Sequence, residues 1–251
     1  MCMALNGLSV LVTRPRLQAQ GVCNLIEQAQ GKAIHFPVID IEAVATDYWT
    51  TAELETLDAI IFVSRNAVDY FVQDNRYALP DKLQLIAVGD GSAESMLLNG
   101  LRVDFRPTQS IGSEGLLLMP ELEDMSDKKV LIVRGKGGRE LLADTLKERG
   151  AEVDYIEVYQ RVLPTPSALQ CEQAVKADAV MCTSIEGVTN LSLLLQQRLS
   201  SLFAKPLLVI SERIKKYAES MGFEQVWVTK DTSDNAIIEL LNQWKENNVE
   251  K

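Results

Sequence analysis

A glycine-rich junction is the first stretch of this sequence whose residue types could perform chemistry. The apolar run "KVLIV" (129–133) leads into "RGKGGREL" (134–141), and the residues that follow have helical spacing. A glycine-rich turn at a helix start exposes backbone N–H groups at the positive end of the helix dipole. Lys136 and Arg139 add positive charge, so the junction has the chemistry of an anion-binding loop. The alternative is that the glycines only allow a tight turn and the charged side chains are solvated.

The spacing of the glycines excludes nucleotide phosphates as the anion. A phosphate-binding loop has a glycine, four further residues and then Gly-Lys followed by Ser or Thr, and this junction lacks that order. The dinucleotide fingerprint needs a glycine at the position that Glu140 occupies. The turns at 13–18 and 88–95 fit neither pattern.

Hydroxyl, glycine and basic residues recur where other predicted strands end. Ligands of parallel α/β sheets bind outside the carboxyl ends of the strands, so we expect these residues to surround one anion-rich ligand. No Cys/His pair, Ser/His pair or carboxylate pair stands at these positions, which argues against a nucleophile with a dedicated base. Each hydroxyl has an alternative interpretation as the N-cap of the helix that follows it. The candidate binding residues are Arg14, Ser64, Ser92, Arg134, Lys136, Gly137, Gly138, Arg139, Thr183, Ser184 and Ser211.

Short apolar, β-rich runs alternate with amphipathic stretches along the whole chain. The stretch "ELLADTLKERG" (140–150), for example, has apolar residues at helical spacing and ends in a glycine. Short strands separated by helices predict an α/β fold with parallel sheets and right-handed crossovers. The predicted strands are 9–13, 32–36, 59–64, 84–89, 102–105, 129–134, 152–159, 179–184, 206–211 and 225–229.

The two halves of this strand series are similar in sequence. Three segments of the first half align, in the same order, with segments of the second half at offsets of 120 to 122 residues. Such a repeat predicts two similar five-stranded α/β units. The aligned pairs are 10–15 with 130–135, 58–68 with 178–188, and 85–100 with 207–222.

Composition narrows the class of protein. The chain is 47% hydrophobic and 24% charged, as soluble globular proteins are, and its net charge of −10 argues against non-specific nucleic-acid binding. No apolar run approaches the roughly 20 residues of a membrane span, and the N-terminal stretch lacks a signal-peptide pattern. The four cysteines lack metal-ligand spacing, and His35 is the only histidine, so a multi-histidine metal centre is excluded. We expect reduced thiols in a cytoplasmic protein.

Five segments together resemble the uroporphyrinogen-III synthase family. The combination of "RGKGGREL" with "GAEVDYIEVYQR" is the most specific part, and the resemblance extends from residue 7 to residue 240. No recognisable signal lies in 42–57, 104–126 and 163–177. The segments are "LVTRP" (11–15), "IFVSRNAV" (61–68), "LIVRGKGGRELLADTLKERGAEV" (131–153), "YIEVYQR" (155–161) and "LLVISERI" (207–214).

The resemblance implies an interleaved two-domain architecture. Each domain would be a five-stranded parallel sheet flanked by helices, and a two-strand hinge would join them with the active site in the cleft between. The first domain would comprise 1–36 and 166–251, and the second 42–158. Residues 37–41 and 159–165 would be the linker strands. The sequence repeat agrees with two similar units but does not by itself reveal the interleaving.

The resemblance also implies a cofactor-independent lyase of tetrapyrrole (haem) biosynthesis. Its substrate, hydroxymethylbilane, loses its hydroxyl as water, forms a spiro intermediate at the terminal ring, and closes with that ring inverted. The eight carboxylates of the substrate suit strand ends rich in N–H, hydroxyl and basic groups. Because free substrate also closes without inversion, the protein must above all enforce a geometry.

Tyr159 is the catalytic residue that the resemblance implies, since it matches the tyrosine of the family's "YQ" pair. A phenol can donate a proton or hydrogen bond to a departing hydroxyl, although it is a weak acid. The alternative role is packing at a strand end. Ser211 stands where some family members carry Gly and Thr, and Glu186 would not help Thr183 and Ser184 to bind carboxylates.

We therefore expect an enzyme without metal or other cofactor, monomeric, with no nucleic-acid or membrane partner. Transient contact with the preceding or following enzymes of the pathway is left open. The competing hypothesis is a non-catalytic two-domain protein that closes on a small polyanion.

Overall fold

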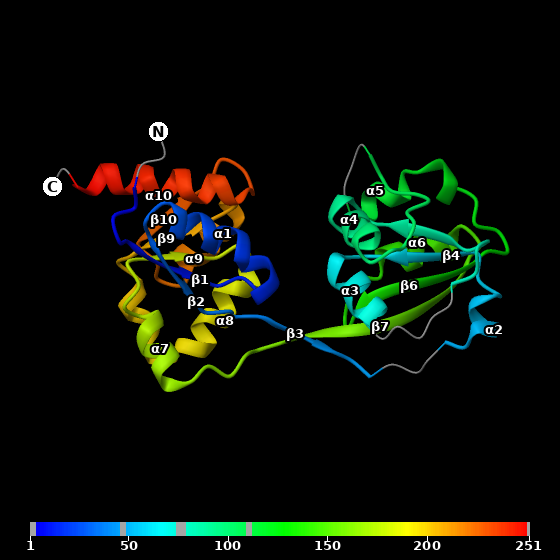
Figure 1. The fold of residues 1–251 in the computed structure, drawn as a ribbon, viewed down its shortest axis with the longest axis horizontal. Helices are drawn as coiled ribbons and strands as arrows, with labels where there is room; N and C mark the ends of the chain where they lie inside the picture. Colours follow the sequence, from blue (N-terminus) through cyan, green and yellow to red (C-terminus); the bar gives the residue numbers. More distant parts are fainter. Residues whose placement is uncertain (1–3, 46–48, 74–78, 109–111, 250–251) are drawn as a thin grey trace. The chain divides into compact units, whose positions relative to one another are not determined.

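The computed structural model describes residues 4–45, 49–73, 79–108 and 112–249. The chain forms two compact units: residues 1–40 with 162–251 (unit 1), and residues 41–161 (unit 2). The colours of Figure 1 show this interleaving, because unit 1 contains blue ribbon together with yellow to red, whereas unit 2 is cyan to green. The boundaries fall at the start of β3 (Asp40–Ala43) and at the end of β7 (Glu152–Val162).

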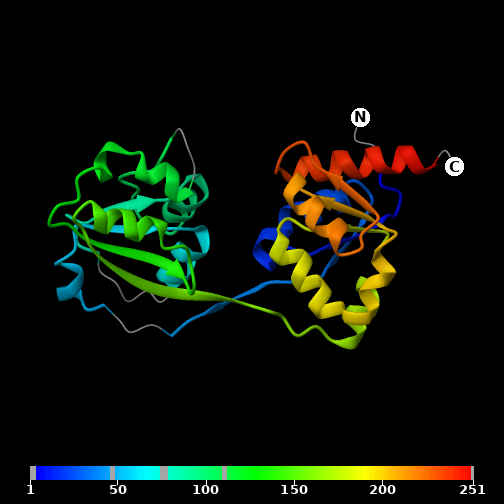
Figure 2. The same cartoon turned by 180° about the vertical axis from the view of Figure 1, so that it is seen from behind.

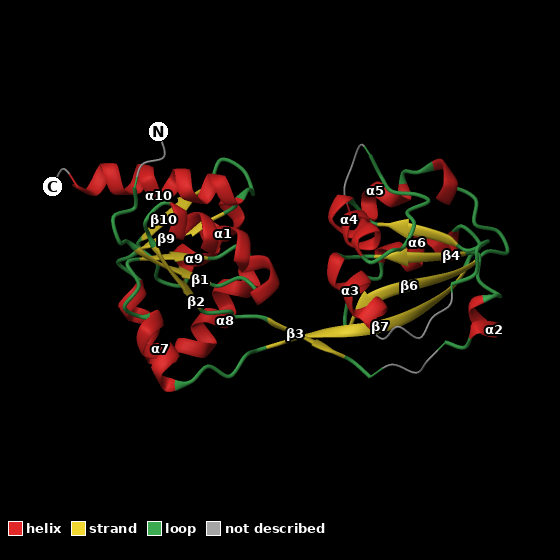
Figure 3. Ribbon diagram, viewed as in Figure 1, coloured by secondary structure: helices red, strands yellow, loops and turns green. Residues whose placement is uncertain are grey.

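Unit 1 is a parallel five-stranded sheet with helices on both faces (Figure 3). Its strand order is β10-β9-β8-β1-β2. The strands are β1 (Ser9–Val12), β2 (Lys32–His35), β8 (Ala179–Met181), β9 (Pro206–Val209) and β10 (Gln225–Val228). The helices are α1 (Arg16–Gln28), α7 (Ala168–Ala174), α8 (Ile185–Leu195), the 3₁₀ helix η2 (Gln196–Leu202), α9 (Glu212–Ser220) and α10 (Asp234–Val249).

Alternation along the strands of unit 1 divides its core into two layers. Val10 and Val12 of β1 pack with α1 and α10 on one face, while Leu11 packs with α7, α8 and α9 on the other. The two views in Figures 1 and 2 show the red α10 on one side of this sheet. Successive residues of a strand point to opposite faces, so apolar residues at every position produce a sheet covered on both sides.

Unit 2 is built in the same way, with the strand order β3-β7-β6-β4-β5. Helices α3 and α4 cover one face, with Ile60 and Phe62 beneath them, and α5 and α6 cover the other, over Ala59 and Ile61. The remaining strands are β4 (Ala59–Phe62), β5 (Gln84–Ala87) and β6 (Lys129–Gly135). The helices are α2 (Thr51–Leu54), α3 (Arg65–Gln73), α4 (Asp90–Leu98), α5 (Gly112–Leu117), the 3₁₀ helix η1 (Pro120–Leu122) and α6 (Leu141–Glu148).

The sequence repeat corresponds to a repeat in topology. The aligned segments place β1 with β6, β4 with β8, and β5 with β9. Unit 1 contains the run β9-β8-β1-β2, and unit 2 contains β5-β4-β6-β7, which is the same order under that correspondence. The two units therefore share an architecture, although each draws its strands from different stretches of the chain.

One predicted strand is not formed. Residues 102–105 make only an isolated parallel bridge, between Phe105 and Ile86, and the fifth strand of unit 2 is β3 instead. The reason is local: the Asp104 carboxylate accepts the Leu85 N–H (2.7 Å) and also the Nε–H of Arg102 (3.1 Å). A side-chain acceptor thus takes a backbone donor that a continuous ladder would have used.

Within the ranges that the structure describes, no helix is both long and apolar enough to cross a bilayer. Cys23, Cys171 and Cys182 are free thiols, and Cys2 lies outside the described residues. Burial raises the pKa of the Cys182 thiol to about 12, so this cysteine is a neutral core residue.

Candidate functional site

A pocket of about 430 Å³ lies at the carboxyl ends of β4, β6 and β7 in unit 2. It brings together seven of the residues that the sequence predicted for the site, from three separate stretches of the chain. These are Ser64, Arg134, Lys136, Gly137, Gly138, Arg139 and Tyr159. Strands β4, β6 and β7 are neighbours in a parallel sheet, so their carboxyl ends meet at one edge.

Tyr159 and Ser64 form a hydroxyl pair in this pocket. The Tyr159 hydroxyl lies 3.1 Å from Ser64 Oγ, and Ser64 Oγ also accepts the Ala67 N–H (3.0 Å) as the cap of α3. The Tyr159 residue is only 5% exposed and its ring stacks on Tyr70, with ring centroids 5.9 Å apart. Ser64 thus caps α3, as the alternative interpretation of the sequence held, and its hydroxyl also lies at the pocket beside that of Tyr159.

A glycine makes the position of the Tyr159 ring possible. Strand β6 shifts register between Arg134 and Gly135, so that Gly135 stands opposite Tyr159. A Cβ at Gly135 would lie 2.5 Å from two ring carbons of Tyr159, which is closer than real Cβ contacts. The Lys136 N–H then donates to the Tyr159 carbonyl (2.8 Å). The first residues of the glycine-rich loop therefore define where the tyrosine ring and backbone lie.

Arg134 binds its own loop. Its side chain is 7% exposed; Nη1 donates to Glu140 Oε1 (2.9 Å) and Nη2 to the Gly138 carbonyl (2.8 Å). The guanidinium also lies 4.4 Å from the centre of the Tyr155 ring. A buried guanidinium needs such partners, because an unpaired charge in the interior is very unfavourable. Arg134, which the sequence offered as a ligand-binding residue, thus has acceptors within its own loop in the free protein.

Tyr155 and Glu140 complete this arrangement. The Tyr155 hydroxyl donates to Glu140 Oε2. Burial, together with the adjacent Glu140 carboxylate, raises the pKa of Tyr155 to about 12. The hydrogen bonds from Tyr155 and Arg134 lower the pKa of Glu140. At neutral pH the tyrosine is thus a neutral donor and the glutamate an ionised acceptor.

Carboxylates of the chain itself accept from two further groups of the loop. The Gly137 N–H donates to Glu157 Oε1 (3.4 Å), with Gly137 in the left-handed region (φ +74°) that suits glycine. Arg139 Nη1 donates to Glu114 Oε1 of α5 (3.1 Å), and both side chains are exposed, by 80% and 56%. Lys136 is also exposed. Two donors of the loop therefore already have carboxylate partners within the chain.

The Arg139–Glu114 pair gives a testable consequence for ligand binding. An exposed ion pair contributes about 0–1 kcal/mol, so an incoming carboxylate can displace Glu114 from Arg139. Replacing Glu114 by glutamine is expected to lower KM for a polycarboxylate substrate by about two- to threefold with kcat unchanged. Arg139→Gln should raise KM instead. Steady-state kinetics at low ionic strength measure both, and equal KM values in all three proteins would contradict a role for Arg139 in binding.

The predicted residues of unit 1 lie at the carboxyl ends of its central strands. Ser184 caps α8 by accepting the Gly187 N–H (2.9 Å), and Ser211 caps α9 by accepting the Ile214 N–H (3.4 Å). Thr183 is half-buried. Arg14 is 13% exposed, and its Nη1 lies 2.5 Å from Asp234 Oδ1 at the start of α10. The capping interpretation is thus confirmed for Ser184 and Ser211, and Arg14 has an internal carboxylate partner.

Ser92 lies apart from the other candidates. It is the third residue of α4 and only 4% exposed. The pocket at Tyr159 is lined by Val88 and Gly112 on that side, not by Ser92. The sequence predicted a strand in this region, and β5 is formed there. Helix α4 begins soon after it, at Asp90, and the Ser92 side chain is buried within the first turn of that helix. Ser92 is therefore not among the residues that line the pocket around Tyr159.

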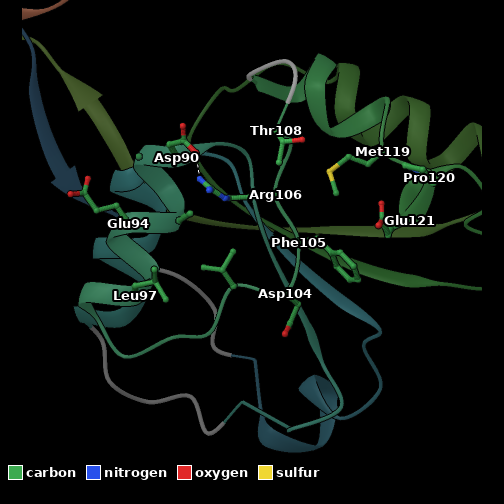
Figure 4. Close-up of a pocket in the computed structure, with 13 residues that line it drawn as sticks. Asp90, Glu94, Leu97, Asp104, Phe105, Arg106, Thr108, Met119, Pro120 and Glu121 are labelled. Atoms are coloured by element: carbon green, nitrogen blue, oxygen red, sulfur yellow. Dashed lines mark hydrogen bonds and ion pairs between the residues drawn. The ribbon is translucent and has the colours of Figure 1, made fainter.

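A larger cavity of about 900 Å³ lies elsewhere in unit 2, between α4, the segment 103–108 and η1 (Figure 4). Its charged side chains are mostly acidic: Asp90, Glu94, Asp104 and Glu121. In Figure 4 the Arg106 side chain points to Asp90, with which it forms an ion pair. Carboxylates lining a cavity disfavour anionic ligands, so the smaller, basic pocket is the better candidate for binding an anion.

Four of the pocket residues with polar or charged side chains were not predicted from the sequence. Arg161 is the last residue of the "YQR" triplet, and that motif could have indicated it. Ser113 and Glu114 belong to α5, in a stretch without a recognisable sequence signal, and only the tertiary fold brings them to the loop. Tyr155 lies on β7 in the same "YIEVYQR" segment as Tyr159, but it packs on the opposite face of the sheet, with α5 and α6.

Comparison with known sequences shows the family to which the whole chain is similar. A family model described as uroporphyrinogen-III synthase HemD matches residues 22–239. The chain is 32% identical over 250 residues to the uroporphyrinogen-III synthase of Escherichia coli K12, covering 93% of this chain and 100% of that one. It is 30% identical over 254 residues to the uroporphyrinogen-III synthase of Salmonella typhimurium LT2, which covers 93% of this chain and 100% of that one.

Comparison with solved structures shows a shared fold. The uroporphyrinogen-III synthetase of Helicobacter pylori superposes with a TM-score of 0.66 at 18% identity, covering 94% of this chain and 99% of that chain. A mutant uroporphyrinogen III synthase of Thermus thermophilus gives a TM-score of 0.58 at 16% identity, covering 98% of this chain and 100% of that chain. At these identities the likeness concerns the fold alone, an α/β fold with parallel sheets flanked by helices.

Proposed function

Since the chain belongs to the uroporphyrinogen-III synthase family, we propose that the pocket around Tyr159 is where unit 2 binds the substrate and assists departure of its hydroxyl. The activity is that of a uroporphyrinogen-III synthase, a cyclising lyase of haem biosynthesis. Hydroxymethylbilane loses water and closes with inversion of its terminal pyrrole ring. The observation that carries the assignment of the site is the Tyr159–Ser64 hydroxyl pair beside a basic, glycine-rich loop.

Tyr159 is proposed to donate a hydrogen bond or proton to the departing hydroxyl. Ser64 Oγ accepts from the Ala67 N–H, and its own proton can be donated to the Tyr159 oxygen. In that arrangement the phenolic proton of Tyr159 is available to the substrate. Loss of hydroxide from carbon becomes loss of water when a proton donor lies within hydrogen-bond distance.

The loop is proposed to hold the acidic arms while the ring inverts. Lys136 and Arg139 are exposed donors at its surface, and Arg161 lines the same pocket. Charge-assisted hydrogen bonds to carboxylates are stronger than neutral ones and directional, so several together restrain the tetrapyrrole. Restraint of the reacting ends is what the reaction needs, since unrestrained substrate closes without inversion. In unit 1, Thr183, Ser184, Ser211 and Arg14 stay as proposed binding residues.

Product analysis tests the proposed function directly. The protein is incubated with freshly prepared hydroxymethylbilane, the products are oxidised, and the uroporphyrin isomers are separated. We expect isomer III to predominate, with isomer I alone in the protein-free control. If isomer I were the only product with protein present, the proposed synthase function would be lost.

A further inference from the structure

We propose that Arg134, Glu140 and Tyr155 form a clamp that closes the glycine-rich loop and thereby positions Tyr159 for the reaction. The clamp residues would be positioning residues, acting through Tyr159. The proposal rests on the function proposed above and adds a role that neither the loop motif nor the "YQ" pair contains.

The clamp is a closed ring of contacts across three elements. Arg134 lies at the end of β6, Glu140 is the N-cap residue of α6, and Tyr155 lies within β7. Arg134 donates to Glu140, Tyr155 donates to the other oxygen of Glu140, and the Arg134 guanidinium lies over the Tyr155 ring. Each member therefore contacts the other two. Such a ring fixes the start of α6 against two strands and leaves the loop between them little freedom.

The loop transmits this constraint to Tyr159 through two contacts. Arg134 Nη2 and Nε donate to the carbonyls of Gly138 (2.8 Å) and Gly135 (3.4 Å), which fixes both ends of the loop. Gly135 lies directly against the Tyr159 ring, and the Lys136 N–H donates to the Tyr159 carbonyl (2.8 Å). Movement of the loop would therefore displace the ring that carries the proposed proton donor.

Protonation supports the same arrangement. Tyr155 stays protonated well above its ordinary pKa of 10.0, to about 12, because of burial and the Glu140 carboxylate. A raised folded-state pKa means that the stabilisation is complete below pH 10 and is lost as the pH rises towards 12. The Tyr155 hydroxyl therefore stays a hydrogen-bond donor to Glu140 at neutral and mildly alkaline pH.

A double-mutant cycle tests whether the clamp acts through Tyr159. Tyr155→Phe removes the hydroxyl but keeps the ring over which Arg134 lies. We expect it to lower kcat about tenfold in the wild type, and less than about twofold in the Tyr159→Phe background. Tyr217→Phe is the matched control, because it removes a comparable half-buried hydroxyl contact, to Thr189 (2.8 Å) in unit 1. Its kcat should stay within about twofold of the wild type.

Two results would overturn the clamp. One is an equal loss of kcat from Tyr155→Phe in both backgrounds, since a residue that acts independently of Tyr159 gives additive effects. The other is full kcat in folded Tyr155→Phe and Glu140→Gln proteins, with folding verified by thermal melting. A second readout needs no turnover: with carbon-13-labelled tyrosine, Tyr155 should titrate at a lower pH in Glu140→Gln than in the wild type. Failure of the wild type to form isomer III would instead overturn the proposed function itself.

Discussion

Gly135→Ala is expected to lower kcat about 100-fold, the largest effect of any loop substitution. The added Cβ would lie 2.5 Å from Cε2 and Cζ of Tyr159. The ring cannot simply retreat, because Tyr70 stacks on it and the residue is buried in the core of unit 2. Either the ring or the β6 backbone must move, and a displacement of about 1 Å at a reacting group is enough for such a loss.

The measurement is steady-state kinetics with product-isomer analysis, together with the melting temperature. Overpacking of this kind also destabilises a protein by about 1–3 kcal/mol, so kcat is measured well below the transition. Gly91→Ala is the matched control, since a Cβ there meets no atom within 4 Å and the residue belongs to α4. Normal kcat in folded Gly135→Ala would show that the position of the Tyr159 ring is irrelevant to turnover.

Tyr159→Phe is expected to lower kcat by about 100-fold, with KM within about threefold of the wild type. The phenylalanine ring keeps the packing against Tyr70 and Gly135, so what is lost is the hydroxyl that lies 3.1 Å from Ser64 Oγ. The proton donor for the departing hydroxyl would be missing, whereas the loop would still bind the carboxylate arms. The fraction of isomer I should rise, because spontaneous closure then competes with slow turnover.

A change in KM alone would contradict this prediction. It would mean that Tyr159 contributes equally to ground state and transition state, as a binding residue does. Unchanged kcat and KM would leave Tyr159 as a packing residue at the end of the strand, which was the alternative that the sequence offered.

Most of the fold could be predicted from the sequence, because each strand is marked by a short apolar run in its own stretch of the chain. Nine of the ten predicted strands are formed, and the 120-residue repeat corresponds to equivalent strands in the two sheets. The prediction at 102–105 was wrong because its apolar alternation did not reveal that the Asp104 side chain would accept the Leu85 N–H. Strand β3 was missed as a sheet strand, since "DIEA" is short and half charged. Its place beside β7 depends on a partner more than 100 residues away in sequence.

The site was predictable in its residue types but not in its internal pairing. Parallel-sheet geometry placed "RGKGGREL" at the carboxyl end of a strand, and the family resemblance added Tyr159 to the same site. What the sequence could not show is which charges the protein itself neutralises: Arg134 by Glu140, and Arg139 by Glu114. Those pairs are set by tertiary contacts between elements. They give the buried Arg134 an internal partner and leave Arg139 exposed.

The most direct test is a crystal structure of the protein with uroporphyrinogen III bound under anaerobic conditions. We predict product carboxylates within hydrogen-bond distance of Lys136 or Arg139, and the inverted ring facing the Tyr159 hydroxyl. Arg134 should keep its contacts with Glu140 and Gly138. Product bound with no contact to the glycine-rich loop, or in the acidic cavity beside α4, would contradict the assignment of the site.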